Sequence, residues 1–370
     1  MLQSAMPNLE KIVVQDYKNI TLQELSFSPN INCITGNNGE GKTNLLDAIW
    51  YLSMTKSAFG VADRYNFRYG ADAFALAGTY RMESGVTSKV ALRVASNGEK
   101  KLVRDDKPCP KLSAHIGTFP IVMVSPSDSS LISESGEERR RFANAVLSQM
   151  DPAYLAGIMQ YNRFLQQRNR MLRDGVMDPE LFTVTDERLA SLAGPLYEAR
   201  ARFAEDLKPV VASYYEALSG GAESVSVEYR SDLAKGPLTE LLAATLERDR
   251  ALRYTGAGLQ RDEFVFTMNG HPIRRCGSQG QQKSFLVALK FAQYEIMKRS
   301  YGFPPMLLLD DVFDKLDLGR IGNLIAMVAG SDFGQIFITD SDKDRLSRIV
   351  DGITDQYCYY IAEKGTFTAR

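Results

Sequence analysis

The feature that most constrains this chain is a glycine-rich run at residues 36–43, which reads GNNGEGKT. It matches the pattern GxxxxGK followed by Ser or Thr without a mismatch, and it lies between a strand-like segment, Ile31–Thr35, and a helical pattern over residues 44–53. In such a turn, successive backbone N–H groups point at phosphate oxygens, and the helix N-terminus adds the positive end of its dipole. We therefore predict a nucleotide-binding P-loop formed by Gly36, Asn37, Asn38, Gly39, Glu40, Gly41, Lys42, Thr43 and Asn44.

An acidic strand end supplies the partner that a P-loop requires for Mg²⁺. Residues 306–311 read MLLLDD, four apolar residues followed by two acids. We expect Lys42 to reach the β- and γ-phosphates of ATP, and Thr43 and Asp310 to hold Mg²⁺. Asp311 would lie next to the γ-phosphate, so Lys42 and Asp311 are the candidate catalytic residues, with Asp311 as the base. Alone, the same run also fits a buried strand that ends in a helix-capping acid, and the P-loop favours the metal site.

The two halves of this predicted site lie near opposite ends of the chain, since 268 residues separate Lys42 from Asp310. Compact P-loop kinases and GTPases do not usually divide their site in this way. A large insertion that leaves the nucleotide-binding domain and returns to it is similar to the organisation of SMC and ABC-type ATPases. The spacing therefore favours that superfamily, by resemblance.

A third motif supports this resemblance. Residues 277–283 read GSQGQQK directly before a helical pattern, and Ser278, Gln279, Gly280 and Gln281 resemble the SxGQ signature of ABC ATPases. In that superfamily the signature Ser and Gly contact the γ-phosphate bound to a second subunit, so that two ATP molecules are sandwiched between two heads. A small hydroxyl and a glycine backbone at a helix N-terminus suit such a contact. Alone, the run also fits an N-cap with a polar first turn.

Two further segments stand in the places of superfamily motifs. Residues 314–317, Asp-Lys-Leu-Asp, follow the acidic strand as the D-loop does, and the resemblance places Asp317 against the partner subunit. Residues 336–340, Ile-Phe-Ile-Thr-Asp, stand in the place of the switch strand, with Thr339 where many ABC proteins carry a histidine. Phosphate sensing here would therefore use a hydroxyl. Both segments also fit ordinary loop chemistry.

The middle of the chain has a different pattern, mostly helical from about residue 137 to residue 252. Apolar residues recur every three or four positions along two long stretches, which a polar segment at residues 173–180 joins. This pattern predicts an antiparallel helical hairpin, although an ordinary helical bundle fits it as well. Pro195 and Pro209 predict that the second stretch is kinked or split.

The composition narrows the classes of function. The chain has 370 residues and a net charge of −1, so DNA binding would need a local patch rather than bulk charge. Four scattered cysteines without a CxxC pair argue against a zinc ribbon and a disulfide framework, and two histidines exclude a multi-histidine metal site. No apolar run reaches the ~18 residues of a membrane span and the N-terminus is no signal peptide, so we expect a soluble, cytoplasmic protein. Candidates for a phosphate-contacting patch, which also fit a solvated helix face, are Arg163, Arg168, Arg170 and Arg173.

Taken together, the motifs resemble the RecF family of bacterial DNA replication and repair proteins along essentially the whole chain. The resemblance rests on Tyr17-Lys18-Asn19 and on residues 41–49 (GKTNLLDAI), 136–142 (GEERRRF), 218–221 (LSGG), 258–263 (GLQRDE), 278–282 (SQGQQ) and 307–317 (LLLDDVFDKLD). Two segments depart from the family pattern. The family usually reads GPHRDD where this chain has Leu259 and Gln260, and RRxFLD where this chain has RRFAN at residues 140–144, including Ala143 and Asn144.

The resemblance implies an α/β fold, an ABC-type P-loop ATPase head built from both chain ends, with an inserted, mainly helical arm domain. We place the N-terminal lobe of the head at residues 1–130, the arm at 131–255 and the C-terminal lobe at 256–370. The resemblance implies ATP and Mg²⁺ as cofactors, a homodimer formed with ATP, and slow, DNA-dependent ATP hydrolysis. It also implies binding to single-stranded, gapped or double-stranded DNA, and RecR- and RecO-type partners with which the protein would assist recombinase loading at gaps.

Two other functions compete with this interpretation. The ATPase subunit of an ABC transporter would carry similar motifs, but they would normally lie closer together than the 268 residues found here, and a transmembrane partner would be needed. An SMC-like chromosome-organising protein would carry a coiled coil of hundreds of residues, longer than this arm. An ATP- and salt-dependent DNA-binding titration separates the first interpretation from the transporter.

Overall fold

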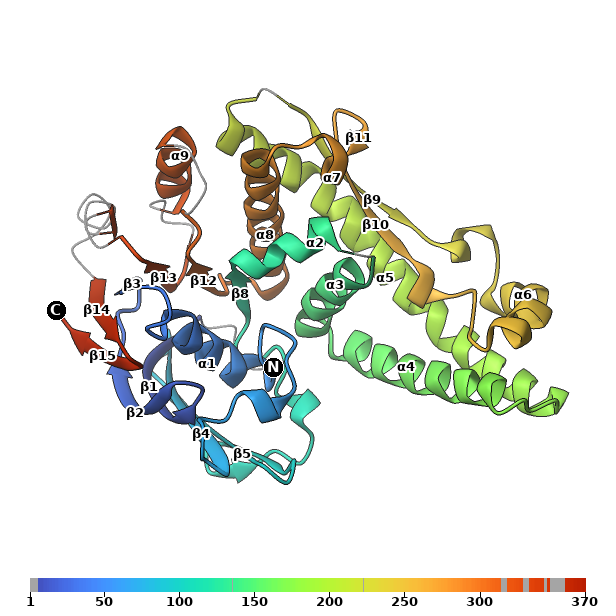
Figure 1. The fold of residues 1–370 in the computed structure, drawn as a ribbon, viewed down its shortest axis with the longest axis horizontal. Helices are drawn as coiled ribbons and strands as arrows, with labels where there is room; N and C mark the ends of the chain where they lie inside the picture. The colour runs from blue at the N-terminus through green and yellow to red at the C-terminus, as the bar shows by residue number, and fades with distance from the viewer. Residues whose placement is uncertain are drawn as a thin grey trace. The chain divides into compact units, whose positions relative to one another are not determined.

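The computed structural model describes residues 6–134, 136–221, 223–313, 318–328, 333–342, 345–346 and 357–370. Its chain divides into two compact units (Figure 1). The first unit contains both ends of the chain, Met1–Asp128 and Gln279–Arg370, together with the short piece Ala217–Ser219. The second unit contains Ser129–Glu216 and Gly220–Ser278. In sequence, the first unit is therefore interrupted by the second.

A six-stranded sheet in the order β15-β14-β3-β13-β12-β8 forms one layer of the first unit. Its strands are β3 (Ile31–Thr35), β8 (Ile121–Val124), β12 (Met306–Asp310), β13 (Ile336–Asp340), β14 (Tyr357–Glu363) and β15 (Thr366–Ala369). All neighbouring pairs are parallel except β14 with β15. Every residue of β3, β8, β12 and β13 is buried, and strands buried on both faces read as nearly continuous apolar runs.

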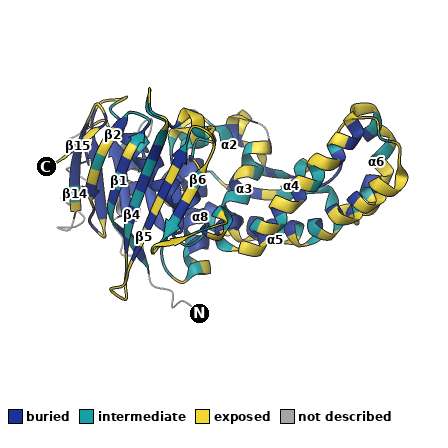
Figure 2. Cartoon of the chain, turned by 90° about the horizontal axis from the view of Figure 1, so that it is seen from below, coloured by how far each residue is buried: buried dark blue, intermediate teal, exposed yellow. Residues whose placement is uncertain are grey.

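A second, antiparallel sheet in the order β2-β1-β4-β5-β6-β7 forms another layer of the same unit. Its strands are β1 (Pro7–Tyr17), β2 (Ile20–Ser26), β4 (Ala73–Met82), β5 (Thr87–Ala95), β6 (Lys100–Arg104) and β7 (Lys107–Pro108). Buried and more exposed residues alternate along β4 and β5, as Figure 2 shows. This period of two is typical of a sheet that packs one face on a core.

Helix α1 (Lys42–Met54) contacts strands of both sheets, among them β1 and β4 of the antiparallel sheet and β12 and β13 of the parallel one. All its residues from Leu45 to Met54 are buried, which is expected of a helix that lies between two layers. Helix α8 (Gln279–Tyr301) contacts β8 and is also largely buried. Further helical elements among the described residues of this unit are α9 (Leu318–Val328) and the 3₁₀ turns η1 (Asp63–Tyr65), η2 (Leu112–Ala114) and η3 (Pro126–Ser129).

The second unit is mainly helical and carries a small antiparallel sheet ordered β11-β10-β9. Its elements are α2 (Ser130–Ser133), α3 (Gly136–Met150), α4 (Pro152–Arg173), α5 (Pro179–Ser219), β9 (Val225–Arg230), η4 (Asp232–Lys235), α6 (Leu238–Leu252), η5 (Leu259–Arg261), β10 (Glu263–Met268), β11 (His271–Pro272) and α7 (Ile273–Cys276). The boundary expected at residue 256 differs from this division, which keeps residues 256–278 in the second unit. The physical reason is that β10 pairs with β9 along its full length.

Helices α4 and α5 form an antiparallel hairpin. Three contacts across it set its direction, namely Tyr154 with Arg200, Gly157 with Leu196, and Arg168 with Asp186. The residue number falls on α5 as it rises on α4, so the two helices run in opposite directions. Each helix begins with a capping aspartate, Asp151 or Asp178, whose side chain accepts a backbone N–H bond, followed directly by a proline.

Of the two outcomes expected for the second stretch, kinked or split, the split is wrong. Pro195 and Pro209 both lie inside α5, which runs unbroken over 41 residues. Both prolines are exposed, so water can bond the backbone carbonyls that lose their helical partner. Phe203, Leu207 and Val211 are among the buried residues of the helix, and this packing offsets the ~3 kcal/mol that an internal proline costs.

Arg168 also differs from its expected place in a surface patch. Its side chain is fully buried and forms ion pairs with Asp186 and Asp249, each at 2.7 Å. A buried guanidinium needs such partners because an unpaired charge costs several kcal/mol to take out of water. Arg163, Arg170 and Arg173 are exposed on the same helix.

Candidate nucleotide-binding site

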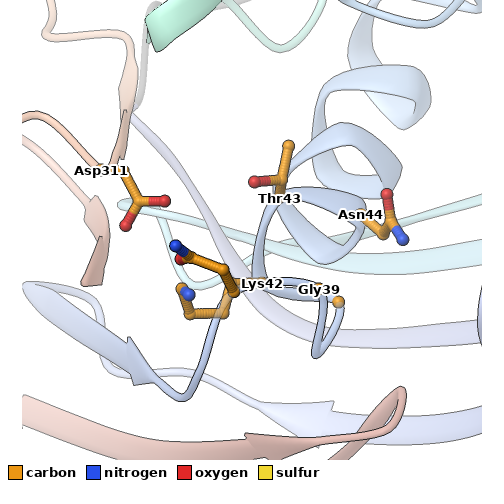
Figure 3. A pocket seen from close by; sticks show the side chains of 7 residues that line it. Gly39, Lys42, Thr43, Asn44 and Asp311 are labelled. Carbon is orange, nitrogen blue, oxygen red and sulfur yellow. The ribbon is translucent and has the colours of Figure 1, made fainter. Parts of the chain in front are cut away.

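A cavity of about 280 Å³ opens where β3 leads into α1, and it reaches the residue that follows β12 (Figure 3). The parallel sheet explains its position, because parallel strands end at the same edge and the loops that follow them meet there. The glycine-rich run and one acid of the MLLLDD segment are thereby brought together. The cavity is lined by Asn38, Gly39, Gly41, Lys42, Thr43, Asn44 and Asp311.

The glycine-rich run curls around the ammonium group of Lys42. Lys42 Nζ donates to the carbonyl oxygens of Gly36 at 2.8 Å and Asn37 at 3.1 Å, and the residue is only 4% exposed. Gly41 has a φ of 107°, in the left-handed region that favours glycine. A Cβ at Gly36 would lie 2.4 Å from the carbonyl oxygen of Ala362, so this position has no room for a side chain. A loop of this kind is suited to present backbone N–H groups to an anion.

One carboxylate, Asp310, joins the P-loop to the neighbouring strands. Thr43 Oγ1 lies 3.0 Å from Asp310 Oδ1 and 2.9 Å from Oδ2, and Thr339 Oγ1 donates to Oδ1 at 2.7 Å. Burial raises the pKa of the Asp310 carboxyl above its usual range, and the two hydroxyl bonds act in the opposite direction. The cluster therefore places a carboxylate and two hydroxyls together, and oxygen atoms of this kind are the ligands that Mg²⁺ prefers.

The backbone turns sharply at Asp311, the residue directly after β12. Its φ is 45°, in a region that residues other than glycine seldom adopt. Its N–H donates to Thr339 Oγ1 at 3.1 Å, and its carbonyl oxygen accepts from Lys283 Nζ at 3.4 Å. These bonds hold the turn, and the Asp311 side chain lines the cavity with Lys42 and Thr43 (Figure 3). Strained backbone of this kind concentrates at functional sites.

The residue after Thr339 adds an ion pair that the sequence analysis missed. Asp340 is almost fully buried at the end of β13, and Arg345 contacts it through two nitrogen atoms, at 2.6 and 2.7 Å. The pair holds the chain as it leaves the strand. The signal was an acid at the end of an apolar run, which resembles the position of Asp310 at the end of β12.

A second missed residue, Asp47, fixes α1 behind the P-loop. It is fully buried and accepts from Tyr17 Oη at 2.7 Å, Lys18 Nζ at 2.5 Å and the backbone N–H of Ala58 at 2.8 Å. Ser57 Oγ donates to the same carboxylate at 2.8 Å. One acid inside the apolar helix NLLDAIWYL was a usable signal, because a buried carboxylate requires donors.

The signature residues begin α8. Ser278 directly precedes the helix, and Gln279, Gly280 and Gln281 form its first turn. These three helical residues do not line the cavity of their own chain. Asp317, with the rest of the predicted D-loop at 314–317, lies outside the described residues.

The two segments that depart from the family pattern lie together in the second unit. Asn144 Oδ1 accepts from Tyr154 Oη at 2.6 Å and from Arg200 at 3.1 Å. Arg200 also donates to the Leu259 carbonyl oxygen at 2.9 Å. Tyr161 Oη donates to Gln260 Oε1 at 2.9 Å. The Leu259 N–H donates to Tyr161 Oη at 3.0 Å, so Asn144, Leu259 and Gln260 belong to one partly buried polar network. Ala143, the residue before Asn144 on α3, is fully buried.

Among the described residues, no group of three or more His, Cys, Asp or Glu side chains is arranged to hold a metal ion. No described helix combines the length and the apolar character that crossing a bilayer requires.

The fold is that of the RecF and SMC head class. The family model described as the RecF/RecN/SMC N terminal domain matches residues 8–358. An Smc head domain from Pyrococcus furiosus has the same fold with a TM-score of 0.57 at 14% identity, covering 99% of this chain and 96% of that chain. Within this class, the chain belongs to the RecF family of DNA replication and repair proteins.

Curated relatives and solved structures support the family across the full length. DNA replication and repair protein RecF of Porphyromonas gingivalis is 42% identical over 358 residues, 96% of this chain and 98% of its own. The RecF protein of Parabacteroides distasonis is 42% identical over 357 residues, with the same coverage. A solved structure of the recombination mediator protein RecF with ATP, of the RecFOR pathway, matches with a TM-score of 0.89 at 27% identity, covering 100% of both chains. A companion structure with ATPγS matches with a TM-score of 0.87 at the same identity, covering 99% of both chains.

Proposed function

We propose that this protein is an ATP-dependent DNA-binding protein of DNA repair and recombination. ATP binding drives two heads together on DNA, and slow hydrolysis releases them. The observation that carries the proposal is the meeting of the P-loop with the acidic strand end, where Thr43 bonds Asp310 across 267 residues of chain. The family membership supports the biological setting.

The residues around the cavity fit a nucleotide with Mg²⁺. The Lys42 ammonium bonds loop carbonyls and would turn to the β- and γ-phosphates, while the loop N–H groups would bond phosphate oxygens. Thr43 and Asp310 would hold the metal, and two protein ligands suffice because Mg²⁺ usually keeps waters and phosphate oxygens as its other ligands. Bound Mg²⁺ neutralises charge that develops on the phosphate oxygens.

Hydrolysis would use the second acid. Asp311 lines the cavity, so its carboxylate is available to orient the attacking water and to accept its proton. Thr339 would be a positioning residue, because its hydroxyl bonds the Asp310 carboxylate and the Asp311 backbone N–H at once. When Mg²⁺ binds at Asp310, a shift of the Thr339 hydroxyl would therefore also move the backbone of Asp311.

The dimer completes the site in this proposal. Ser278, Gln279, Gly280 and Gln281 would contact the γ-phosphate bound to the partner head, and Asp317 would face the same interface. Support comes from the position of the signature residues at the N-terminus of the 23-residue helix α8, which is suited to an anion. The ATP-bound relative shows that a protein of this fold holds the nucleotide.

We infer the partners by extending the role of the relatives to this chain. The related structures are described as mediators of the RecFOR pathway, and we extend that role, with RecR- and RecO-type partners and with single-stranded or gapped DNA, to this chain. The exposed arginines Arg163, Arg170 and Arg173 are candidates for phosphate contacts.

A DNA-binding titration tests the proposal. Fluorescence anisotropy of a labelled gapped duplex should show tighter binding with ATP and Mg²⁺ than without nucleotide, and the affinity should fall as salt rises. An intact duplex of the same length is the control for gap preference. DNA binding that does not respond to ATP would reject the switch, and no DNA binding at any salt concentration would favour the transporter-type ATPase.

A further inference from the structure

The turn between β14 and β15 consists of an exposed residue, Lys364, and a buried one, Gly365, and a buried residue is unusual in a hairpin turn. Glu363 pairs with Thr366, so Lys364 and Gly365 form a two-residue connection with φ values of 50° and 80°. Both values are positive, as the tight turns of hairpins require. Turn residues normally lie on the surface. Gly365 is nevertheless buried, because the turn packs against the P-loop.

Both amides of this turn bond one P-loop residue. The Gly365 N–H donates to the backbone carbonyl oxygen of Glu40 at 2.8 Å. The Lys364 N–H donates to Glu40 Oε2. Because the carboxylate of Glu40 accepts this bond, the side chain is held at the turn, on the hairpin side of the loop.

Close packing joins the same hairpin to the rest of the loop. The carbonyl oxygen of Ala362 occupies the space where a Gly36 side chain would begin, 2.4 Å from an ideal Cβ. A Cβ at Gly365 would lie 2.2 Å from the carbonyl oxygen of Asn19. Asn19 in turn lies against Gly41, where a Cβ would be 2.8 Å from Asn19 Oδ1. The hairpin therefore contacts the start and middle of the P-loop directly, and its end through Asn19.

The hairpin is itself firmly anchored. β14 pairs with β3, the strand that leads into the P-loop. Tyr360 Oη donates to the Ser26 carbonyl oxygen at 2.5 Å, and the Phe367 N–H donates to Gln23 Oε1 at 2.9 Å. These bonds attach the hairpin to β2 of the other sheet. A turn held in this way is able to fix a neighbouring loop.

We propose that the Lys364-Gly365 turn is a positioning element for the P-loop. It holds residues 36–41 in the conformation that binds phosphates. Because coupling between two sites is reciprocal, ATP binding in turn stabilises the hydrogen bonds between the turn and Glu40. A loop that is ordered before binding loses less entropy when the nucleotide arrives, which is how the turn would raise ATP affinity. The inference rests on the proposed function, in that the P-loop binds ATP.

Three substitutions test the contact between the turn and the P-loop, two at Glu40 and one at Gly365, and a fourth substitution is a control. Glu40→Ala removes the side-chain acceptor of the Lys364 amide, whereas Glu40→Gln keeps an oxygen in its place. Gly365→Ala forces a methyl group against the carbonyl oxygen of Asn19. Gly85→Ala is its matched control, because Gly85 lies in the turn between β4 and β5 with the same φ of 80° and no atom within 4 Å of an added Cβ.

We expect Glu40→Ala and Gly365→Ala to weaken the binding of a fluorescent ATP analogue with Mg²⁺ by about fivefold, the effect of one or two lost hydrogen bonds. Glu40→Gln should recover most of the affinity that Glu40→Ala loses, and Gly85→Ala should stay within about twofold of the parent protein. Rescue by Gln separates positioning of the loop from a general loss of structure. If Gly365→Ala does not fold, the two Glu40 variants decide the question.

Hydrogen exchange supplies the second readout. In the parent protein, ATP and Mg²⁺ should slow exchange of the Lys364 and Gly365 amides, and this protection should be lost at Lys364 in Glu40→Ala. The inference is overturned if Glu40→Ala binds the analogue as tightly as the parent, if Glu40→Gln binds as weakly as Glu40→Ala, or if the two amides exchange equally with and without ATP. A parent protein that bound no ATP would instead reject the proposed function.

Discussion

Thr43 Oγ1 lies 2.9 Å from Asp310 Oδ2, although 267 residues separate the two positions in the chain. The contact exists because β12 lies beside β13, and β13 beside β3, in one parallel sheet. The strand that precedes the P-loop and the strand that ends in Asp310 therefore finish at the same edge. Neither end of the chain forms this arrangement alone.

Lys42→Ala should abolish tight ATP binding. The side chain is the cation at the centre of the P-loop, and its removal leaves the β- and γ-phosphates without their charge partner. Isothermal titration calorimetry should show at least a tenfold loss of affinity, about 1.4 kcal/mol or more. The control is Lys107→Ala, which removes an exposed lysine of β7 in the same unit. Equal affinity in the two variants would remove the site assignment.

Substitutions of the adjacent acids Asp310 and Asp311 should have different effects. Asp311→Asn should leave ATP binding intact and slow hydrolysis, because an amide is a poor base. Asp310→Asn should weaken the dependence of nucleotide binding on Mg²⁺, because it removes the charge next to Thr43. Single-turnover hydrolysis and a Mg²⁺ titration measure the two effects. Identical behaviour of both variants would contradict the division of roles.

Thr339 should act through the acids that it bonds. Thr339→Val removes the bond to Asp310 and the acceptor of the Asp311 N–H without a large change in volume, whereas Thr339→Ser keeps both. We expect the Val variant to hydrolyse ATP at least about tenfold more slowly, equivalent to ~1.4 kcal/mol in the barrier, and the Ser variant to recover most of the rate. A Ser variant as slow as the Val variant would argue against a role for the hydroxyl.

Ser278→Arg should separate a two-headed ATP sandwich from a self-contained enzyme. A bulky side chain at the signature should spare ATP binding to one head and block the closed dimer, and hydrolysis and ATP-stimulated DNA binding should fall with it. Sedimentation with ATP and Mg²⁺ should show a monomer under conditions in which the parent protein dimerises. Normal dimerisation and turnover in this variant would leave only a P-loop ATPase of another mechanism.

Arg168→Ala should destabilise the helical hairpin strongly. The change leaves the fully buried Asp249 without its cation, and breaking a buried pair of this kind costs about 3–5 kcal/mol. Arg170→Ala, two residues along α4, removes a largely exposed arginine that pairs with Asp174 at 3.5 Å, and it should cost less than about 0.5 kcal/mol. Urea unfolding followed by circular dichroism measures the difference. Similar midpoints for both variants would contradict the importance of the buried pair.

Local pattern was enough to predict some parts of the molecule and not others. The P-loop and the strands at residues 31–35 and 306–309 were predictable because motif spacing and continuous apolar runs are local signals. The burial of Arg168 was not predictable, because helical periodicity assigns an arginine to the solvent face. That periodicity carries no information about its partner Asp249, which lies 81 positions away. The bonds from the last hairpin to Glu40 depend likewise on a partner 324 residues distant, which no window of sequence contains.

The interruption of the first unit by the second has a consequence for protein synthesis. β3 leaves the ribosome roughly 300 residues before its neighbours β13 and β14, an interval of about 15–60 s at ordinary elongation rates. During this interval a buried apolar strand has no lateral partners, and unpaired strands of that kind are prone to aggregate. The second unit lies almost entirely within one continuous stretch, so it can fold first on the nascent chain. Among the N-terminal strands, β3 is therefore the one that most needs protection by chaperones, because the strands of the antiparallel sheet find their partners within the first 108 residues.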